Sequence, residues 1–586
     1  MLKQIPYGIS NFKDLKESNM YYIDKTKFIE NLEQKIRYQF FIRPRRFGKS
    51  LFLTMLETYY DIYEKENFQK YFGDLYIGKN PTPNANKYLI LSMSFANVIS
   101  DQGKDKLIES FDSIVSKSVN SCLKKYSKIL NEDKLPAKDN NATYAIDFLN
   151  AAAKAVNAKI FVLIDEYDNF ANNIMNNNQT LYEDLTHQDG YVKTFYKGIK
   201  EGTADGVMPR AFVTGVSPIM LDDLTSGANI FEVISNDLDL NHIMGFSEDD
   251  LQDIIKYYDL DKKFDLTNLQ EVLRNYCNGY KFNEKSINTV YNTDMVLYIL
   301  KSIISTGDYP KTLIDSNVKT DYTRLRKMAE FFASKNELNE IIETGIVGPV
   351  EIQDRFNLES LQESNDKETN LWSLLYYIGM LTIDSPFENK TMLKIPNYAI
   401  KQLYWDYMAN TYKVTKSTRY SELIRAMHSM RITGNTNDIM DIYEKVINNI
   451  STKDLTHFNE ASCKSIFITL VFTDGIYLIE SEREANGGYT DLYLKENYLY
   501  AEHVKYRFMI EFKHIKTGDL KGDLNALSKD EIIKQNTTLI DKYKGDAKKQ
   551  LNKYMQDFNV LQDSDRILKK YTIIVLGRKY IVADEV

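Results

Sequence analysis

The 586-residue chain is poor in several residue types that mark common protein classes. It contains 3 cysteines, Cys122, Cys277 and Cys463, which lie far apart and form no Cys-x-x-Cys pair. This disfavours a disulfide scaffold and a cysteine-based zinc site, and we expect a reducing, cytoplasmic location. No apolar run approaches the roughly 20 residues that span a bilayer, so we expect no membrane partner. The first residues lack the apolar core of a secretory signal, and we expect none.

Histidine is also scarce, with 6 residues in the chain. None has the His-x-x-x-His or His-Glu-x-x-His spacing of a zinc site. A Gly-x-Ser-x-Gly turn and a Ser/His/Asp arrangement are missing as well, which argues against a serine hydrolase. The remaining candidates for chemistry are carboxylates, lysines and a glycine-containing loop.

The composition that is present indicates a folded protein of several domains. Hydrophobic residues make up 43% and charged residues 27%, which excludes a disordered or fibrous chain. At about 150 residues per domain, the length suggests about three to four domains. The net charge is −8, but a binding site depends on local charge. Residues 35–49 hold six Lys and Arg and no acid, and residues 495–580 hold 18 Lys and Arg against 12 Asp and Glu, a balance of +6.

Three regions differ in their hydrophobic patterns. In the first, apolar runs at 37–42, 88–95, 160–164 and 210–216 alternate with helical patterns at 50–63 and 104–130, which predicts an α/β layer with a parallel sheet. The second is mostly helical, with predicted helices at 247–258, 421–430 and 438–450. The third has the order αβββαβ, with helices at 460–472 and 546–558 and strands at 475–480, 490–494, 507–513 and 571–577.

The segment Arg43–Ser50 has the context of a phosphate-binding loop, because it follows a predicted strand and precedes a helix. Backbone N–H groups at a helix start bind anions. We expect Lys49 to reach the β- and γ-phosphates and Ser50 to bind Mg²⁺. The first glycine of the GxxxxGK[ST] motif would fall at Arg43, so this segment alone leaves an ordinary basic turn open. Its arginines fit phosphate binding, action on a neighbouring subunit's nucleotide, or DNA contact.

Two further strand ends supply polar residues. Asp165 and Glu166 follow the apolar run 160–164, as in a Walker B element. We expect Asp165 to bind Mg²⁺ mainly through water and Glu166 to polarise the attacking water. The next predicted strand ends near Thr214 and Ser217, either of which would lie beside the γ-phosphate; an ordinary turn fits equally well.

A second candidate site lies near the C-terminus. Glu511 and Lys513 flank Phe512 on one strand and therefore point to the same face, which Asp491 on the adjacent strand can reach. Two carboxylates can hold Mg²⁺ or Mn²⁺ for phosphodiester chemistry, and Lys513 can orient water or stabilise developing charge. The alternative is a surface ladder of charges, which a buried Phe512 would disfavour. His514 would point to the opposite face in a structural role.

Several segments resemble the bacterial AAA-ATPase-like family, whose members commonly carry a C-terminal PD-(D/E)XK nuclease domain. The matching segments are 21–26, 41–51, 163–168, 214–218, 245–247, 278–282, 371–375 and 395–398. An arginine at position 43 is usual in this family. The resemblance implies a nucleotide site that includes Arg46, Phe47, Gly48, Lys49, Ser50, Leu51, Asp165, Thr214 and Ser217. It also implies Glu460 as a further metal ligand and Gln550, in the pattern Ala547, Gln550 and Tyr554, as a supporting nuclease residue.

These observations predict a P-loop NTPase α/β domain at 1–245, a helical and winged-helix-like region at 246–450, and a restriction-endonuclease-like α/β domain at 451–586. We expect ATP and Mg²⁺ as cofactors, with Mn²⁺ an option at the nuclease site. The predicted function is an ATP-binding and ATP-hydrolysing protein that controls a metal-dependent nuclease, with DNA the favoured nucleic acid; a homo-oligomer is left open. Two alternatives are a nucleotide-dependent interaction switch and an ATPase remodeller, each with a nuclease-like domain that binds without cutting.

Overall fold

The chain is an α/β multidomain protein, as the sequence predicts, and it divides into two units. The first comprises residues 1–338 and 346–399, and the second comprises 339–345 and 400–586. The computed structural model describes residues 2–136, 141–169, 190–219, 221, 230–320, 341–342, 344–357, 360–361, 366–411, 419–450, 458–485, 488–558 and 565–586. The domain boundaries at 245 and 450 stay predictions.

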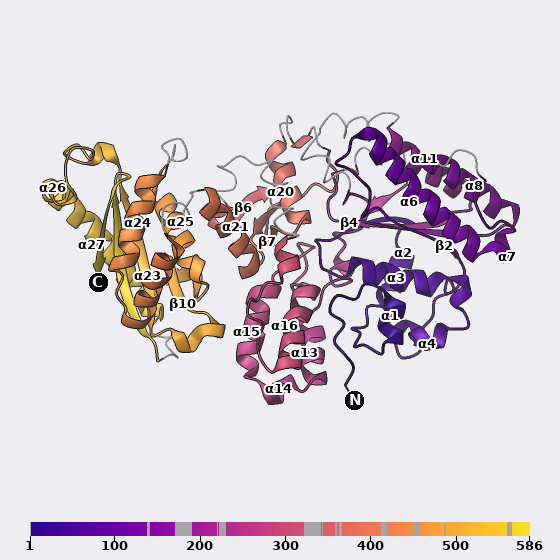
Figure 1. The fold of residues 1–586 in the computed structure, drawn as a ribbon, viewed down its shortest axis with the longest axis horizontal. Helices are drawn as coiled ribbons and strands as arrows, with labels where there is room; N and C mark the ends of the chain where they lie inside the picture. The colour runs from indigo at the N-terminus through magenta and orange to yellow at the C-terminus, as the bar shows by residue number, and fades with distance from the viewer. Residues whose placement is uncertain are drawn as a thin grey trace. The chain divides into compact units, whose positions relative to one another are not determined.

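The first unit is built on five parallel strands in the order β2-β3-β4-β1-β5. The strands are β1 (Tyr38–Ile42), β2 (Leu89–Ser94), β3 (Ile160–Asp165), β4 (Arg210–Gly215) and β5 (Glu232–Val233). Figure 1 shows α6 (Lys104–Lys125), α8 (Ala142–Ala155) and α11 (Tyr191–Ala204) over one face of this sheet and α3 (Lys49–Tyr60) under the other. Helices on both faces bury the strands, which is why they read as continuous apolar runs. The predicted parallel layer is confirmed; the short β5 was not predicted.

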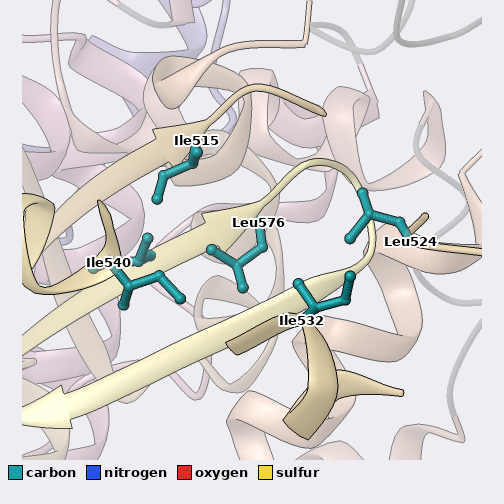
Figure 2. Packing of buried hydrophobic residues seen from close by; sticks show 6 residues of the cluster. Ile515, Leu524, Ile532, Ile540 and Leu576 are labelled. Carbon is teal, nitrogen blue, oxygen red and sulfur yellow. The ribbon is translucent and has the colours of Figure 1, made fainter. Parts of the chain in front are cut away.

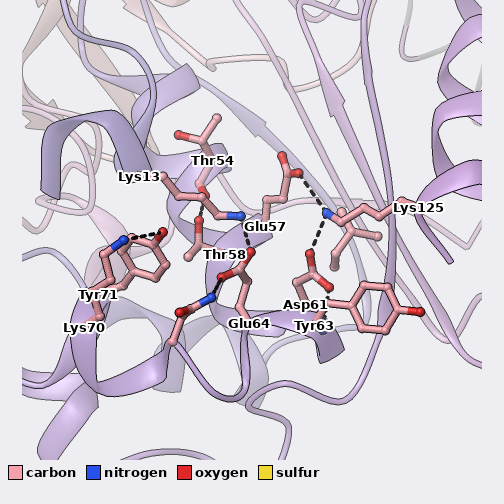
Figure 3. Close-up of polar contacts among 12 residues, drawn as sticks. Lys13, Thr54, Glu57, Thr58, Asp61, Tyr63, Glu64, Lys70, Tyr71 and Lys125 are labelled. Carbon is pink, nitrogen blue, oxygen red and sulfur yellow. Dashed lines mark hydrogen bonds and ion pairs between the residues drawn. The ribbon is translucent and has the colours of Figure 1, made fainter. Parts of the chain in front are cut away.

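The far end of α3 is fixed by partly buried ion pairs (Figure 3). Lys125 of α6 lies 2.6 Å from Asp61, which is fully buried, and 3.9 Å from Glu57. Lys13 pairs with Glu64 nearby. Because α3 begins at Lys49, these contacts hold the helix that carries the phosphate loop at its start. The shorter helices here are α1 (Phe12–Glu17), α2 (Phe28–Gln34), α4 (Phe68–Phe72), α5 (Tyr76–Lys79) and α7 (Ser127–Leu130).

The rest of the first unit contains a group of helices and a small sheet. The helices are α13 (Glu248–Tyr257), α14 (Leu260–Lys263), α15 (Leu266–Cys277) and α16 (Thr293–Thr306). Ser247 is the N-cap of α13 and forms a capping box with Asp250. After α20 (Lys367–Tyr377), the hairpin of β7 (Thr382–Phe387) and β8 (Lys390–Lys394) joins β6 (Ile346–Val350) in an antiparallel sheet. The helical character of this region is confirmed, its strands were not predicted, and the winged-helix-like part stays a prediction.

The second unit contains a mixed sheet in the order β13-β12-β11-β10-β9, in which only β11 and β12 pair in parallel. Its strands are β9 (Tyr477–Ala485), β10 (Gly488–Glu496), β11 (Tyr506–Ile515), β12 (Ile567–Leu576) and β13 (Tyr580–Glu585). The helices are α21 (Tyr398–Thr411), whose first two residues belong to the first unit, α23 (Tyr420–Thr433), α24 (Asn437–Asn449), α25 (Glu460–Val471), α26 (Lys529–Gln535) and α27 (Thr537–Phe558). The predicted order αβββαβ is confirmed, with α26 and β13 added.

Helices α26 and α27 pack on the sheet of the second unit (Figure 2). Ile515 of β11 pairs in register with Leu576 of β12, and both belong to one buried cluster with Ile532 of α26 and Ile540 of α27. Burying each such side chain stabilises the fold by about 1.5–3 kcal/mol. This core fixes the end of β11, the strand that carries Glu511 and Lys513.

Candidate functional site

The phosphate loop, residues Arg43–Ser50, joins β1 to α3 at the carboxyl edge of the parallel sheet. Open α/β sheets bind ligands at this edge, where the strand order reverses. The left-handed residues of the loop are Arg46, with φ 69°, and Gly48, with φ 90°. Lys49 donates hydrogen bonds of 2.9 Å to the carbonyls of Arg43 and Pro44. Burial lowers the pKa of Lys49 to about 8.

Ser50 and the end of β3 come together beneath this loop. The Ser50 hydroxyl donates a 2.6 Å hydrogen bond to Asp165 Oδ2. A hydroxyl beside a carboxylate is a donor set that Mg²⁺ takes together with waters and phosphate oxygens, so the two residues fit the ion. Glu166 adopts a left-handed backbone with φ 50°, and burial, followed by the charge of Asp165, raises its pKa. A raised pKa suits a group that accepts a proton from water.

The end of β4 is held by internal hydrogen bonds. The Thr214 hydroxyl donates to the carbonyl of Phe41 at 2.8 Å. Asp168 accepts from the backbone N–H of Ser217 at 2.7 Å and from that of Val216. At this strand end, Val216 lines the cavity beside the phosphate loop. A γ-phosphate contact by Thr214 or Ser217 therefore stays a prediction.

A cavity of about 440 Å³ lies over the phosphate loop. Its polar lining includes Arg45, Arg46, Lys49, Ser50, Asp165 and Glu166. Its apolar lining includes Ile9, Tyr21, Ile23, Met244, Ile254 and Leu297. The size falls in the range of small-ligand sites, and the mixture of polar and apolar walls suits a nucleotide with its phosphates at the loop. Hydrophobic periodicity could not find the apolar walls, because they come from separate segments of the chain.

The basic residues 35–49 do not form one exposed patch. Lys35 pairs with Asp237 at 2.7 Å and with Asp239 at 2.8 Å. Arg43 is 1% exposed, which excludes it from DNA contact and from acting on a neighbouring subunit's nucleotide. Arg46 lines the cavity and lies 3.5 Å from Asp294.

The C-terminal candidate residues meet on β10, β11 and α25. Lys513 Nζ lies 3.1 Å from Glu511 Oε1 and 3.1 Å from Glu460 Oε1. Asp491 Oδ2 accepts a 2.8 Å hydrogen bond from the backbone N–H of Phe512. Phe512, which separates Glu511 from Lys513 in the sequence, is fully buried, and Glu511 is 1% exposed, so the arrangement is no exposed ladder of charges. The structure thus brings together the side chains of Glu460, Asp491, Glu511 and Lys513.

The electrostatics of this second site favour a cation between the carboxylates. Glu511 is 1% exposed, and its Oε2 is buried without a hydrogen-bond partner. Burial, followed by the charge of Asp491, raises the pKa of Glu511 to about 8. Across the described residues, no three His, Cys, Asp or Glu side chains form a ready metal cage. Mg²⁺ uses one or two carboxylates and completes its shell with water and substrate oxygens, so Asp491 and Glu511 fit it.

Two residues near these carboxylates were not assigned a role from the sequence. Lys464, one turn after Glu460 on α25, is 3% exposed. Burial raises the pKa of Asp491, and the Phe512 N–H and the Lys464 ammonium act against that rise. Tyr554 of α27 is also buried; burial and the charges of Glu511 and Asp491 raise its pKa, and a hydrogen bond with Gln550 lowers it. Lys464 follows Glu460 by four residues on a predicted helix, and this spacing could have indicated that both side chains lie on the same face.

His514 lies away from this site, as expected from strand alternation. Its Nε2 is 2.8 Å from the carbonyl of Gly577, and its ring stands edge-on to Phe458 with centroids 5.0 Å apart. Burial lowers its pKa. These contacts are those of a packed structural histidine.

Comparison with known families assigns both ends of the chain. Residues 6–225 match the AAA-ATPase-like family model, described as predicted AAA-ATPase, and residues 458–585 match the PD-(D/E)XK nuclease superfamily model. The chain carries an AAA-ATPase-like domain and a PD-(D/E)XK nuclease-superfamily domain. The phosphate loop, Asp165 and Glu166 lie in the AAA-ATPase-like domain. Glu460, Asp491, Glu511 and Lys513 lie in the nuclease-superfamily domain.

Individual relatives are distant. An uncharacterized protein in the vnfD 5′ region of Azotobacter chroococcum mcd 1 is 26% identical over 327 residues, 51% of this chain and 52% of that protein. The chain thus spans about half the length of this curated relative. Cdc6p from Pyrobaculum aerophilum (TM-score 0.26) and the Aeropyrum pernix ORC2 protein (TM-score 0.30) are each 10% identical, with 66% of this chain and 93% of theirs aligned. Within the described ranges, no helix is long and apolar enough to span a bilayer.

Proposed function

We propose that this protein is a metal-dependent nuclease that cleaves nucleic acid, DNA being favoured, under the control of ATP bound at its phosphate loop. The observation that carries the nuclease assignment is the Glu511 carboxylate. One oxygen of this carboxylate contacts Lys513, and the other is buried without a hydrogen-bond partner. The charge of Asp491 helps to raise the pKa of the same carboxyl group. Two neighbouring carboxylates repel each other when both are ionised, and a divalent cation bound between them offsets that repulsion.

Each residue of the nuclease site has a separate task in this proposal. Asp491 and Glu511 would hold Mg²⁺ or Mn²⁺, which polarises the scissile phosphate and acidifies a water when bound. Lys513 is fixed between Glu511 and Glu460, so its ammonium is already oriented toward charge that develops on the phosphate. Burial acts to lower the pKa of Lys513, but the neighbouring carboxylates raise it above its ordinary value. The lysine therefore stays charged through the reaction.

The nucleotide site is proposed to bind and hydrolyse ATP. Lys49 is buried under the loop, with an ammonium that can turn from the two carbonyls to the β- and γ-phosphates. Ser50 and Asp165 would hold Mg²⁺ on the phosphate oxygens. Glu166 lines the same cavity and would orient the attacking water.

Local charge supports nucleic acid as the substrate. Residues 495–580, which include β11 and α27, carry 18 Lys and Arg against 12 Asp and Glu in a chain whose net charge is −8. An excess of positive charge around the site attracts a phosphate backbone. DNA over RNA, a homo-oligomer and a cytoplasmic location stay predictions.

The test uses the purified full-length protein with labelled linear DNA, and with RNA of the same sequence. Reactions contain Mg²⁺ or Mn²⁺, with and without ATP, and a matched set contains chelator. We expect cleavage that requires the metal and changes severalfold with ATP, and Lys49→Ala should remove the ATP effect. ATP turnover without cleavage would favour a remodeller, and nucleotide-dependent DNA binding without cleavage would favour an interaction switch.

A further inference from the structure

Arg43 begins the phosphate loop, but its side chain is buried beside the nucleotide cavity and does not line it. Its Nη1 donates to the carbonyl of Ser235 at 2.6 Å and to that of Ile42 at 3.0 Å. Its Nη2 donates to the carbonyl of Leu240 at 3.2 Å. The guanidinium thus joins the end of β1 to the segment 235–240, almost 200 positions further along the chain.

Two aromatic rings complete the surroundings of Arg43. The guanidinium carbon lies 3.9 Å from the centroid of the Phe282 ring and 4.4 Å from that of Phe41. In the part of the chain that the structure describes, no carboxylate pairs with Arg43. Burial accordingly lowers its pKa to about 10, against the favourable influence of Tyr376 and Tyr377 on α20. Burying a cation among carbonyls and aromatic faces, without a carboxylate, costs desolvation free energy. A role in filling space in the core would not require such a residue.

The backbone at position 43 does not require glycine either. The positive φ values of the loop fall at Arg46 and Gly48, and Arg43 is not among the residues with positive φ. An arginine can therefore stand where the usual motif has glycine without strain in the loop. What the substitution adds is the link from the loop to residues 235–240 and 282.

The rest of the loop contacts the same region. The Phe47 ring lies 4.9 Å from that of Tyr280 and 5.6 Å from that of Phe282, between centroids. The Phe47 carbonyl accepts a 3.1 Å hydrogen bond from the N–H of Gly245. Pro44 packs against Gly379, where an added Cβ would come within 2.8 Å of the proline. One side of the loop therefore lies against residues 278–282 and 376–380, and the other faces the cavity.

We propose that Arg43 is a positioning residue that transmits nucleotide occupancy from the phosphate loop to residues 278–284 and 374–381. This deepens the proposed function and rests on ATP binding at the loop. Phosphates that bind the loop restrict its backbone. Because Arg43 holds that backbone to Ser235, Leu240 and Phe282, the restriction extends to the aromatic residues that pack on it. Without the guanidinium, the loop can still bind phosphate through Lys49 and Ser50, but it moves independently of these residues.

The experiment is amide hydrogen exchange of the full-length protein with and without Mg²⁺ and ATP, read in four peptides covering 42–50, 235–246, 278–284 and 374–381. In the native chain we expect ATP to slow exchange in all four. Arg43→Met removes the charge and donors but keeps a long side chain. It should retain protection at 42–50, lose at least two thirds of the protection at 278–284 and 374–381, and weaken ATP binding by roughly 2- to 30-fold. Arg210→Met is the matched control, because Arg210 begins β4 at the end of the strand away from the phosphate loop. This variant should behave as the native chain.

A second variant keeps the test decisive if Arg43→Met does not fold. Arg43→Lys retains the charge but has no forked group that can donate to the Ser235 and Leu240 carbonyls together. It should therefore also lose the ATP-induced protection at 278–284 and 374–381. Native-like protection at 278–284 and 374–381 in a folded Arg43 variant would overturn the proposal, and so would an equal loss in Arg210→Met. If ATP protects only 42–50 in the native chain, the coupling is wrong while ATP binding stands. If ATP protects no peptide, the ATP-binding function itself fails.

Discussion

Glu511 Oε1 contacts the Lys513 ammonium at 3.1 Å, while Glu511 Oε2 is buried without a partner. The same lysine also lies 3.1 Å from Glu460, whose side chain is 42% exposed. The carboxylate is therefore only half satisfied within the protein. Buried polar atoms are rarely left unpaired in native proteins, and an unpaired carboxylate oxygen beside Asp491 marks the position for a cation.

The first prediction concerns the pH dependence of metal binding. Burial and Asp491 raise the pKa of Glu511 to about 8, so this carboxyl is mainly protonated at pH 7 when no metal is bound. A metal must displace that proton, and the apparent affinity for Mn²⁺ should rise about tenfold per pH unit between about pH 6 and 8 and then level off. Calorimetric titration in buffers of different ionisation enthalpy would also detect the released proton. Affinity independent of pH over this range would contradict the assignment.

Stability without metal should have the opposite dependence on pH. Between its ordinary pKa of 4.5 and about 8, Glu511 binds more protons in the folded chain than in the unfolded chain. The free energy of unfolding of the second unit therefore falls as pH rises through this window. Glu511→Gln stays neutral and should flatten the profile. A native-like slope in that variant would show that another group is responsible.

The second prediction concerns Lys49. Its buried ammonium should provide much of the attraction for the β- and γ-phosphates, so Lys49→Ala should weaken binding of a fluorescent ATP analogue at least tenfold. Lys106→Ala is the control, because Lys106 lies on α6 in an exposed pair with Glu109. Unchanged affinity in Lys49→Ala would refute the phosphate-loop interpretation.

The third prediction separates ATP binding from hydrolysis. Glu166→Gln preserves the shape of the side chain and removes the base, so ATP affinity should stay within about threefold while turnover falls by roughly 10²–10⁴-fold. Steady-state phosphate release and equilibrium nucleotide binding measure the two quantities. Turnover at the native rate would exclude Glu166 as the group that activates water.

The fourth prediction concerns the support of α3. Lys125→Met leaves fully buried Asp61 without its cation, and we expect the free energy of unfolding of the first unit to fall by about 1–3 kcal/mol. In a Trp405→Phe background, the buried Trp372 is the remaining tryptophan and reports this unit by fluorescence during urea unfolding. The control Lys106→Met breaks an exposed pair and should change stability by no more than about 0.5 kcal/mol. Equal effects of the two variants would contradict a special role for Asp61.

Residues close together in the chain were predicted most successfully. The apolar run 160–164 followed by Asp165 indicated a buried strand with a carboxylate at its end, and that strand is β3. The alternation of Glu511, Phe512 and Lys513 placed both charges on one face because strand geometry has a period of two. The central elements αβββαβ followed from similar local patterns. The strand β5 has 2 residues, too few for such a pattern, and β7 and β8 are longer but contain no continuous apolar run.

Contacts between residues far apart in the chain could not be predicted from the sequence. Arg43 read as one of several basic residues that could reach phosphate or DNA, yet its partners are the carbonyls of Ser235 and Leu240. From the sequence, Thr214 fitted either a residue beside the phosphate or an ordinary turn, and no local pattern showed that its hydroxyl donates to Phe41 of the neighbouring strand. The environment of a polar side chain depends on which distant backbone packs beside it, and no local pattern records that.

The most direct test of the central claim is the rate of metal-dependent DNA cleavage by the native chain and by Asp491→Asn, which keeps the size of the side chain and its acceptor toward the Phe512 N–H. The account predicts cleavage by the native protein in Mn²⁺ or Mg²⁺, and cleavage at least about 100-fold slower in Asp491→Asn. Equal cleavage by both proteins under the same conditions would contradict the assignment of the metal site to Asp491 and Glu511.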